Sequence, residues 1–324
     1  MQIQRLLALS LAIAVVACGD RAQTVSTFVV DTLPGGVPRT MSSAPMEPGR
    51  WQLELLRELQ PAADAPGELM EPQSLAIADD GSVIVADTRP AVIKVFGPDG
   101  SYQRSFGREG AGPGEFRVAW IALRGDTLVV QDPTNSRATL FNWRDGTVLR
   151  SQPTACCFWV PIDVDGSRRA WLRLMAPLPD TTVPFGQGFI RLSLAGGATD
   201  TVFAYERRDL PKQATWALRV GGQTRLSMPV PFTPQVHWTV DPAGGLLSGW
   251  SGEYSIRVSR NGQDSVAVFG RRWTPQRVES AEQDRVYETI VKQLSSAGQG
   301  LDEISVRNSF DKAAMPSTRP AYDF

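Results

Sequence analysis

The chain has 324 residues, and its content of 42% hydrophobic and 21% charged residues is ordinary for a folded globular protein. With 33 basic and 34 acidic residues the formal net charge is −1, which excludes the overall positive field that attracts nucleic acids or anionic membranes. The sequence contains one histidine, His237, which excludes chemistry that needs several histidine ligands.

An export signal is predicted at the N-terminus. Arg5 precedes the apolar run LLALSLAIAVVA at residues 6–17, which is 12 residues long. A membrane-spanning helix needs about 20 residues to cross a hydrocarbon core of about 30 Å, so this run is too short to span a bilayer. A positive start, a short apolar stretch and a small residue at its end are typical of a secretory signal peptide.

The residue after this run is Cys18, in the context VVAC, which resembles the lipobox of bacterial lipoproteins. The resemblance implies cleavage before Cys18, acylation of its sulfur and new amino group, and, since Gly19 follows, sorting to the outer membrane. An ordinary signal peptide followed by a chance cysteine is the alternative. We therefore predict a signal peptide at 1–17, a lipid-anchored tether at 18–50, and an exported protein held at the outer membrane, facing the periplasm.

An internal repeat organises the rest of the chain. Glycine-containing turns followed by a short β-prone strand recur, and each is followed by a strand, a tight turn at Asp-Gly, Gly-Gly or Asn-Gly, and another strand. Such turns supply the positive φ angles that hairpins need. Together with the strand before the first turn, each repeat has four short strands. We predict these repeats at about 70–107, 116–152, 157–203 and 235–270, with an insertion near 204–234.

The spacing of the repeats predicts an all-β fold. Gly100 and Gly146, in the first two hairpin turns, lie 46 residues apart, and Gly146 and Gly196 lie 50 residues apart. A period of this length with four strands per unit is the signature of β-propeller blades. We therefore predict a β-propeller of four-stranded blades over residues 51–324.

The first repeat, 66–116, has a Pro-Gly-acidic-apolar start, an inner strand, Asp-x-Gly, a strand ending Ala-Asp-Thr and a strand ending Val-Phe. Its start, PGEL, recurs as PGEF 47 residues later. This order of parts resembles the NHL-repeat family and exported six-bladed β-propellers, over about 50–270. The family has an arginine before the third strand, which Arg137 matches, whereas Val92 stands there in the first repeat. The resemblance implies a six-bladed propeller.

The closure of the ring is the part of the fold that the pattern determines least. Residues 271–314 interrupt the repeats, and Thr274-Pro275 followed by apolar residues every three or four positions predicts a helix over 275–297. Trp51–Leu59 is predicted as the outer strand of an incomplete blade, and MPSTRPAYDF as the start of another. We predict a propeller incomplete at its C-terminus; a smaller closed ring or closure with a partner are the alternatives.

Four residues are candidates for ligand binding at a propeller face or channel: Asp87, Asp132, Arg137 and His237. Aspartates at strand ends could hold Ca²⁺, although such residues more often bond their own backbone. Cys156 and Cys157 are adjacent, which strains a disulfide between them, and their redox state stays open. The tryptophans could stack on sugars or peptides, or fill the core.

No set of residues forms a recognisable catalytic group, and no C-x-x-C or G-x-S-x-G motif is present. We therefore predict a non-catalytic, membrane-anchored scaffold that recognises a protein, peptide or glycan, without nucleic acid and without a required cofactor. The alternative is a calcium-dependent propeller hydrolase resembling lactonases. That alternative needs several Asp, Glu and Asn oxygens to meet at one mouth of the channel.

Overall fold

A computed structural model describes residues 27–43, 53–55, 58–59, 61, 63–154, 161–174, 187–204, 211, 213–220, 223–296 and 302–322. The predicted signal peptide and the three cysteines, Cys18, Cys156 and Cys157, lie outside the described residues. In the described part, no helix is both long and apolar enough to cross a membrane.

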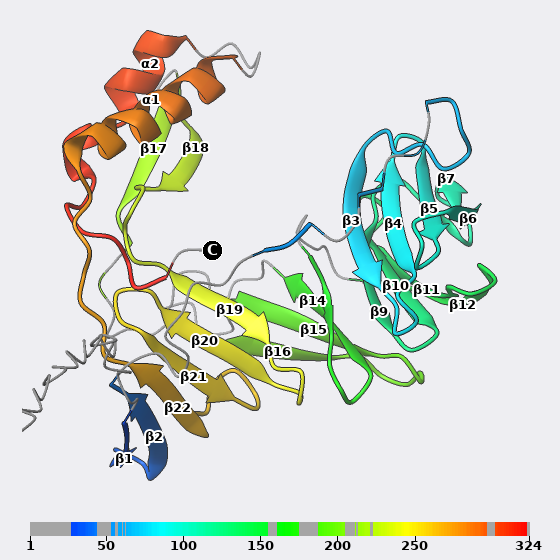
Figure 1. The fold of residues 1–324 in the computed structure, drawn as a ribbon, viewed down its shortest axis with the longest axis horizontal. Coiled ribbons are helices and arrows are strands. Elements are labelled where there is room, and N and C mark those ends of the chain that lie inside the picture. The colour runs from blue at the N-terminus through cyan, green and yellow to red at the C-terminus, as the bar shows by residue number, and fades with distance from the viewer. Residues whose placement is uncertain are drawn as a thin grey trace, which may run out of the picture.

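The first three predicted repeats each form one four-stranded antiparallel sheet, which we call blades 1, 2 and 3. In each blade the first strand lies nearest the centre of the molecule (Figure 1). Blade 1 consists of β3 (Pro72–Ile77), β4 (Val83–Thr88), β5 (Ala91–Phe96) and β6 (Tyr102–Phe106). Blade 2 consists of β9 (Trp120–Arg124), β10 (Thr127–Asp132), β11 (Arg137–Asn142) and β12 (Val148–Pro153). Blade 3 consists of β13 (Asp163–Val164), β14 (Arg169–Leu174), β15 (Gln187–Ser193) and β16 (Asp200–Ala204). A short parallel pair, β7 (Arg108–Glu109) and β8 (Glu115–Phe116), links blades 1 and 2.

The fourth repeat forms blade 4, and its sheet is larger than predicted. Its own strands are β19 (Val236–Val240), β20 (Leu246–Trp250), β21 (Ser255–Ser259) and β22 (Ala267–Arg271). The outer strand β22 pairs in parallel with β2 (Val37–Ser42), which forms a hairpin with β1 (Phe28–Leu33). The N-terminal hairpin therefore extends blade 4 to six strands in the order β1-β2-β22-β21-β20-β19.

Part of the segment predicted as a tether over 18–50 is folded: residues 28–42 belong to this sheet, and β1 lies where the sequence TFVVD at 27–31 predicts a strand. The β-branched residues of β1, Val29, Val30 and Thr32, favour a strand, and the glycine pair at its turn allows the hairpin: Gly35 and Gly36 have φ angles of +85° and +79°. Ten residues separate Cys18 from Phe28. Fully extended, ten residues reach at most about 35 Å.

The glycines that predicted the blade hairpins adopt the backbone that the prediction requires. The φ angles of Gly100, Gly146, Gly196 and Gly262 are +86°, +78°, +103° and +84°, which confirms tight turns at these positions. Gly146 also lies against the neighbouring blade, since a Cβ atom built there would come within 2.7 Å of Phe106 Cβ. A side chain at position 146 would therefore push blades 1 and 2 apart.

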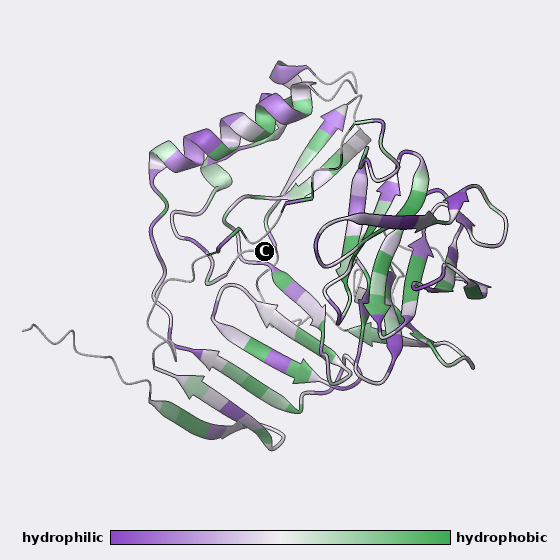
Figure 2. Cartoon of the chain, turned by 45° about the vertical axis from the view of Figure 1, so that its right-hand side comes forward, coloured by the Kyte–Doolittle hydropathy of each residue, from purple (hydrophilic) through white to green (hydrophobic). Residues whose placement is uncertain are grey.

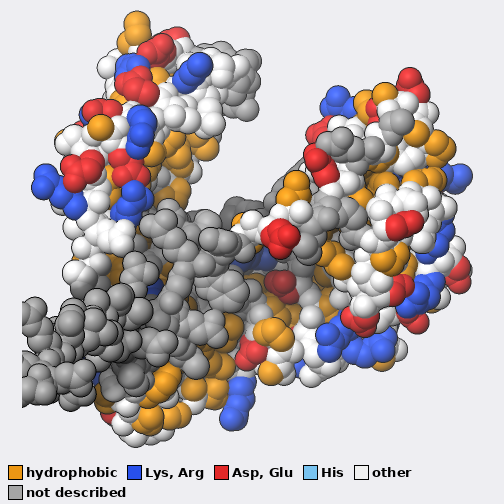
Figure 3. Space-filling model, in the orientation of Figure 1, with side chains coloured by type: hydrophobic (Ala, Val, Ile, Leu, Met, Phe, Trp, Pro, Cys, Tyr) orange, Lys and Arg blue, Asp and Glu red, His pale blue; other side chains and the backbone are white. Residues whose placement is uncertain are grey.

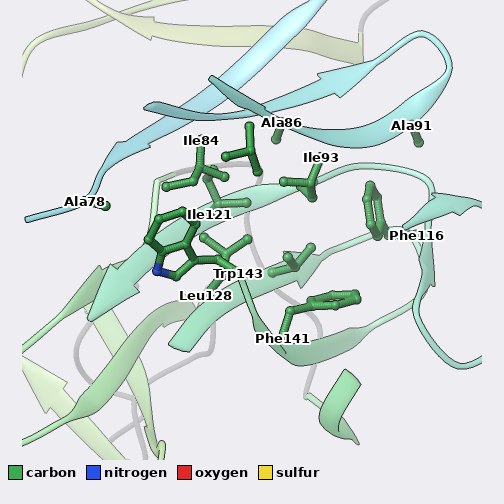
Figure 4. Close-up of a cluster of buried hydrophobic side chains, with 13 residues drawn as sticks. Ala78, Ile84, Ala86, Ala91, Ile93, Phe116, Ile121, Leu128, Phe141 and Trp143 are labelled. Atoms are coloured by element: carbon green, nitrogen blue, oxygen red, sulfur yellow. The ribbon is translucent and has the colours of Figure 1, made fainter. Parts of the chain in front are cut away.

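The core of the molecule lies between blades, where hydrophobic side chains from facing sheets interdigitate. Between blades 1 and 2, Ile84 and Ile93 pack with Leu128 and Phe141, all at most 1% exposed (Figure 4). Figure 2 shows hydrophobic and hydrophilic residues alternating along the strands, as expected of sheets. Each such side chain that is fully buried contributes about 1.5–3 kcal/mol. Equivalent clusters join blade 2 to blade 3, and blade 3 to blade 4.

Two predicted insertions meet in a separate unit, which we call the arm. The hairpin β17 (Thr215–Val220) and β18 (Gln223–Pro229) lies in the predicted insertion near 204–234, and α1 (Ser280–Ser296) lies within the predicted helix 275–297. A second helix, α2 (Glu303–Ser309), and a 3₁₀ turn (Lys312–Ala314) complete the arm. The Trp216 ring stacks on Phe310 at 4.9 Å between centroids and meets Tyr287 edge-on.

The described sheets follow an open arc from blade 1 to blade 4, and the arm stands at the blade 4 end (Figure 1). The space-filling view shows a wide hollow between the arm and blade 1 (Figure 3).

Among the described residues of Trp51–Leu59 none lies in a strand; Leu59 instead packs on Val83 and Val85 of blade 1. Nor do the described residues of the C-terminal segment 315–324 form the predicted inner strand: Ala321 N donates to Ser251 O, and Tyr322 packs on blade 4.

Candidate functional site

Asp87, a predicted binding residue, lies at the end of β4 with none of its surface exposed. Its carboxylate accepts hydrogen bonds from Met70 N (2.9 Å) and Glu71 N (2.7 Å), in the loop that leads into β3. Lys94 Nζ lies 2.9 Å from Asp87 Oδ2 and forms a buried ion pair with it. These contacts fasten the lead-in loop to blade 1. A role of Asp87 in ligand binding stays a prediction.

Asp132 and Arg137 hold the corresponding loop of blade 2. Asp132 is 2% exposed and accepts hydrogen bonds from Arg117 N (2.9 Å) and Thr134 N (3.0 Å). Arg137 is its register partner across the β10–β11 hairpin and donates to Ala111 O (2.9 Å) and Glu115 O (2.8 Å). The arginine expected from the resemblance thus binds backbone carbonyls of the segment that links blades 1 and 2, and a ligand-binding role for the pair stays a prediction.

In blade 1, which lacks that arginine, Lys94 makes the equivalent contacts, and the sequence analysis did not identify this residue. Lys94, two residues after Val92 and so on the same face of β5, donates to Glu68 O as well as to Asp87. It is 7% exposed. A buried lysine beside a buried aspartate fixes the same loop that Arg137 fixes in blade 2. The signal in the sequence is the charged Lys94 in the otherwise apolar strand AVIKVF.

His237 lies on β19, the innermost strand of blade 4, away from the three residues above. Its ring is 5.7 Å from the ring of Tyr322, which also meets Tyr254 edge-on at 5.7 Å. Burial raises the pKa of Tyr322 to about 12, so its hydroxyl keeps its proton at neutral pH. His237 is therefore part of an aromatic contact between blade 4 and the C-terminal segment.

A cavity that sequence reasoning did not find lies where the innermost strands of blades 1, 2 and 3 end. It has a volume of about 420 Å³ and we call it the axial pocket. The residues that line it come from the ends of β3 and β9 and from the turns after β3, β9 and β13: Ile77, Asp79, Leu123, Arg124, Gly125, Gly166 and Arg168. Because each blade contributes one turn, no short sequence motif marks this pocket.

The side chains of the axial pocket combine positive charge with apolar surface. Arg124 and Arg168 are exposed, and Ile77 is 66% exposed. Asp79 is the one acidic residue in the lining. Arg168 adopts the left-handed backbone, with φ +59°, in the turn where its N donates to Asp165 O (3.0 Å). The pocket therefore presents two guanidinium groups beside an exposed aliphatic side chain.

Beside the pocket, Arg144 joins the first turns of blades 1 and 2. Its Nε donates to Asp126 Oδ1 (2.6 Å), and its Nη1 lies 3.3 Å from Asp80 Oδ2. Hydrogen bonds from Ser82 and from Arg144 lower the pKa of Asp80. The single positive charge of Arg144 therefore balances one of these two carboxylates, so one negative charge remains beside Arg124 and Arg168.

The wall of the axial pocket at blade 3 is closed by a backbone contact with blade 4. Gly166 N donates to Pro242 O at 2.7 Å. A Cβ atom at position 166 would lie 2.8 Å from the same oxygen, so only glycine allows this approach. The turns of blades 3 and 4 are thereby locked together at the pocket.

No three or more His, Cys, Asp or Glu side chains gather at one point in the part of the chain that the structure describes. Ca²⁺ is also held by Asn and backbone carbonyl oxygens, so the calcium-dependent hydrolase considered from the sequence stays a prediction.

Four-stranded antiparallel sheets that pack face to face, with their first strands toward a common axis, define the β-propeller class, and the chain is an all-β propeller protein. Among solved structures it is similar to an exported protein of Bacteroides fragilis, with 10% identity and a TM-score of 0.41 over 85% of this chain. It is also similar to U3-55K (12% identity, TM-score 0.38, 63% of this chain) and to a streptogramin B lyase (11%, 0.32, 57%). The matches span 65%, 50% and 49% of those three chains. No protein-family model and no curated protein matches the sequence.

Proposed function

We propose that the protein is a binding module, exported and held at a membrane by lipid on Cys18, whose axial pocket receives a protein segment carrying acidic and apolar side chains. The observation that carries the proposal is the pairing of Arg124 and Arg168 with the exposed Ile77 in one cavity. Arginine is enriched at protein interfaces and binds carboxylates with two parallel hydrogen bonds. An exposed aliphatic side chain beside it favours a partner that is not purely polar.

The position of the axial pocket supports recognition by several blades at once. Arg124 ends β9 of blade 2 and Arg168 precedes β14 of blade 3, while Ile77 ends β3 of blade 1. The inter-blade cores hold these three turns in place. A partner segment that contacts all three gains affinity from a preformed surface, since little of the pocket has to be ordered on binding.

Reversing both charges in the axial pocket is expected to abolish selection of acidic peptides. We would select a random peptide display library against the protein and measure the Kd of the enriched peptides. Arg124→Glu with Arg168→Glu should weaken binding at least about tenfold, because each hydrogen bond to a charged group contributes about 1.5–3 kcal/mol.

The matched control is Arg89→Glu. The Arg89 side chain is 78% exposed and directly follows β4, at the end of the strand away from the axial pocket. This variant should leave peptide binding unchanged. Enrichment of basic peptides, or equal binding by the double variant, would contradict the proposal.

The proposed anchor rests on the apolar run at 6–17 and the cysteine that follows it. Cys18→Ala is expected to move the protein from the membrane fraction to the soluble fraction and to abolish incorporation of labelled palmitate. Each buried CH₂ group of an acyl chain contributes about 0.8 kcal/mol, so loss of the chains removes the anchor. Cys156→Ala serves as the matched control and should keep both signals. Membrane association that survives Cys18→Ala would refute the anchor.

A further inference from the structure

The six-stranded sheet of blade 4 carries two adjoining cavities on one face, which together we call the sheet groove. One has a volume of about 420 Å³ and the other about 20 Å³, and both are lined by Ser255 and Arg257. The larger cavity continues to Arg39 on β2, and the smaller one to Trp238 on β19.

The strand register explains why these side chains share one face. Trp238 pairs with Ser248, Ser248 with Arg257, Arg257 with Val268, and Val268 with Arg39. Residues paired across a sheet project from the same side. With strands about 4.8 Å apart, the row from Trp238 to Arg39 is about 19 Å long. An indole, a hydroxyl and two guanidinium groups thus follow one line.

A second indole lies where the two cavities meet. Trp250 lines the smaller cavity and Gly252 the larger one. A Cβ atom at position 252 would come within 2.3 Å of the Trp250 ring, so the absence of a side chain there leaves room for the indole. Trp273 lines the larger cavity beyond this point. Three partly buried tryptophans, Trp238, Trp250 and Trp273, therefore border the sheet groove.

The sheet groove is the outer part of a face whose inner part is covered by blade 3. Trp238 packs against the cluster that contains Trp171 and Val240, which joins the two blades. The addition of β2 and β1 beyond β22 extends the same face outward. The N-terminal hairpin thereby supplies Arg39 and the far wall of the groove.

The lining of the sheet groove carries an excess of positive charge. It contains Arg39, Arg257 and Arg271, and Glu253 is its one acidic residue. Arg39 donates through Nε and Nη2 to the two carboxylate oxygens of Asp31 and forms an ion pair with it, and Arg257 donates to the Ser265 hydroxyl. Asp31 thus balances the charge of Arg39, so the excess positive charge of the lining comes from Arg257 and Arg271, and planar guanidinium groups suit carboxylates.

We propose that the sheet groove binds an acidic oligosaccharide, a chain of sugar rings that carry carboxylates. Indoles offer flat apolar faces for sugar rings, and the arginines bind the carboxylates. An extended peptide is a poorer fit, because the row of lining side chains crosses the strands of the sheet, whereas a peptide that pairs through its backbone runs along a strand edge. This site is separate from the axial pocket and does not depend on the function proposed there.

An array of defined oligosaccharides tests the proposal with the full-length protein in detergent micelles. The acidic probes are oligogalacturonate and oligomannuronate, and the neutral probes are malto- and cello-oligosaccharides of equal length. We expect saturable binding of at least one acidic probe and none of the neutral probes. Arg257→Gln should weaken that binding about tenfold or more. Arg260→Gln, in an exposed residue outside the lining, should leave the Kd unchanged.

Arg39→Gln, at the other end of the row, provides a second variant in case Arg257→Gln impairs folding. This variant should also weaken binding of the acidic probe, and its melting temperature should equal that of the wild-type protein. Binding of neither acidic probe, equal binding of acidic and neutral probes, or undiminished binding by a folded Arg39→Gln protein would each overturn the proposal. Peptides selected by the axial pocket should not compete with the oligosaccharide.

Discussion

Replacing Asp87 by alanine is expected to lower the free energy of unfolding by about 3–5 kcal/mol, because it leaves a buried charge without its partner. Lys94 Nζ lies 2.9 Å from the Asp87 carboxylate, with side chains 9% and 0% exposed. The substitution also leaves the amide groups of Met70 and Glu71 without their acceptor. Urea unfolding followed by tryptophan fluorescence measures the loss.

A second substitution separates the cost of the unpaired Lys94 charge from the other costs of Asp87→Ala. In Asp87→Ala with Lys94→Met no buried charge is left unpaired, so the double variant should be more stable than Asp87→Ala alone. Asp126→Ala is the matched control: this carboxylate is 63% exposed and pairs with Arg144 on the surface, so little change is expected. An Asp87→Ala protein as stable as wild type would show that the lead-in loop does not depend on this carboxylate.

The same interaction predicts a dependence on pH. Burial tends to raise the pKa of Asp87, but hydrogen bonds from Met70 N, Lys94 and Glu71 N outweigh it, and the pKa lies below the ordinary value of 3.8. A lowered carboxyl pKa contributes stability that is complete above the unfolded-state value and is lost as the pH falls through the folded-state value. The difference in stability between wild type and Asp87→Ala should therefore be full at neutral pH and shrink below about pH 3.8.

The parts of the fold that depend on local chemistry could be predicted from the sequence. Tight turns need a residue that tolerates positive φ, and Gly100 and Gly146 stand at the centre of hairpins for that reason. Regular spacing of such turns then predicts repeated four-stranded sheets. The helix at Ser280–Ser296 follows from its apolar spacing in the same local way.

Contacts between distant segments could not be predicted. β2 pairs in parallel with β22, although the two strands lie more than two hundred residues apart in the sequence. Neither strand has a sequence feature that predicts this pairing. The same holds for the axial pocket, where Ile77, Arg124 and Arg168 come from three separate turns. Asp87 was found as a repeated position, but its burial against Lys94 depends on how the lead-in loop folds back. The repeat pattern of the sequence therefore identified the repeated positions. The roles of the residues at these positions could be assigned only from their contacts in the folded protein.

Replacing Trp171 by alanine is expected to destabilise the protein by about 3–5 kcal/mol, the cost of removing a large aromatic side chain from a core. Trp171, on β14, is 1% exposed in the cluster that joins blade 3 to blade 4. Its ring meets Phe189 edge-on at 5.9 Å between centroids. Urea unfolding measures the loss, and Trp273→Ala, at a partly buried residue, should cost much less.

Trp171→Phe distinguishes the volume of the indole from its hydrogen bond. Trp171 Nε1 donates to Asp165 Oδ2 at 2.9 Å, and Asp165 is fully buried. Phenylalanine keeps most of the packing but removes the Nε1–H donor. Removing one hydrogen-bond donor from a buried carboxylate costs about 1–3 kcal/mol. Asp165 also accepts from Arg169 N and Nε, which places the expected loss toward the lower end of that range. Equal losses for Trp171→Phe and Trp171→Ala would mean that the hydrogen bond to Asp165 within blade 3, and not the volume of the indole, accounts for the stabilisation. A smaller loss for phenylalanine would mean that blade 4, and with it the sheet groove, is held in the arc by close packing of its inner face.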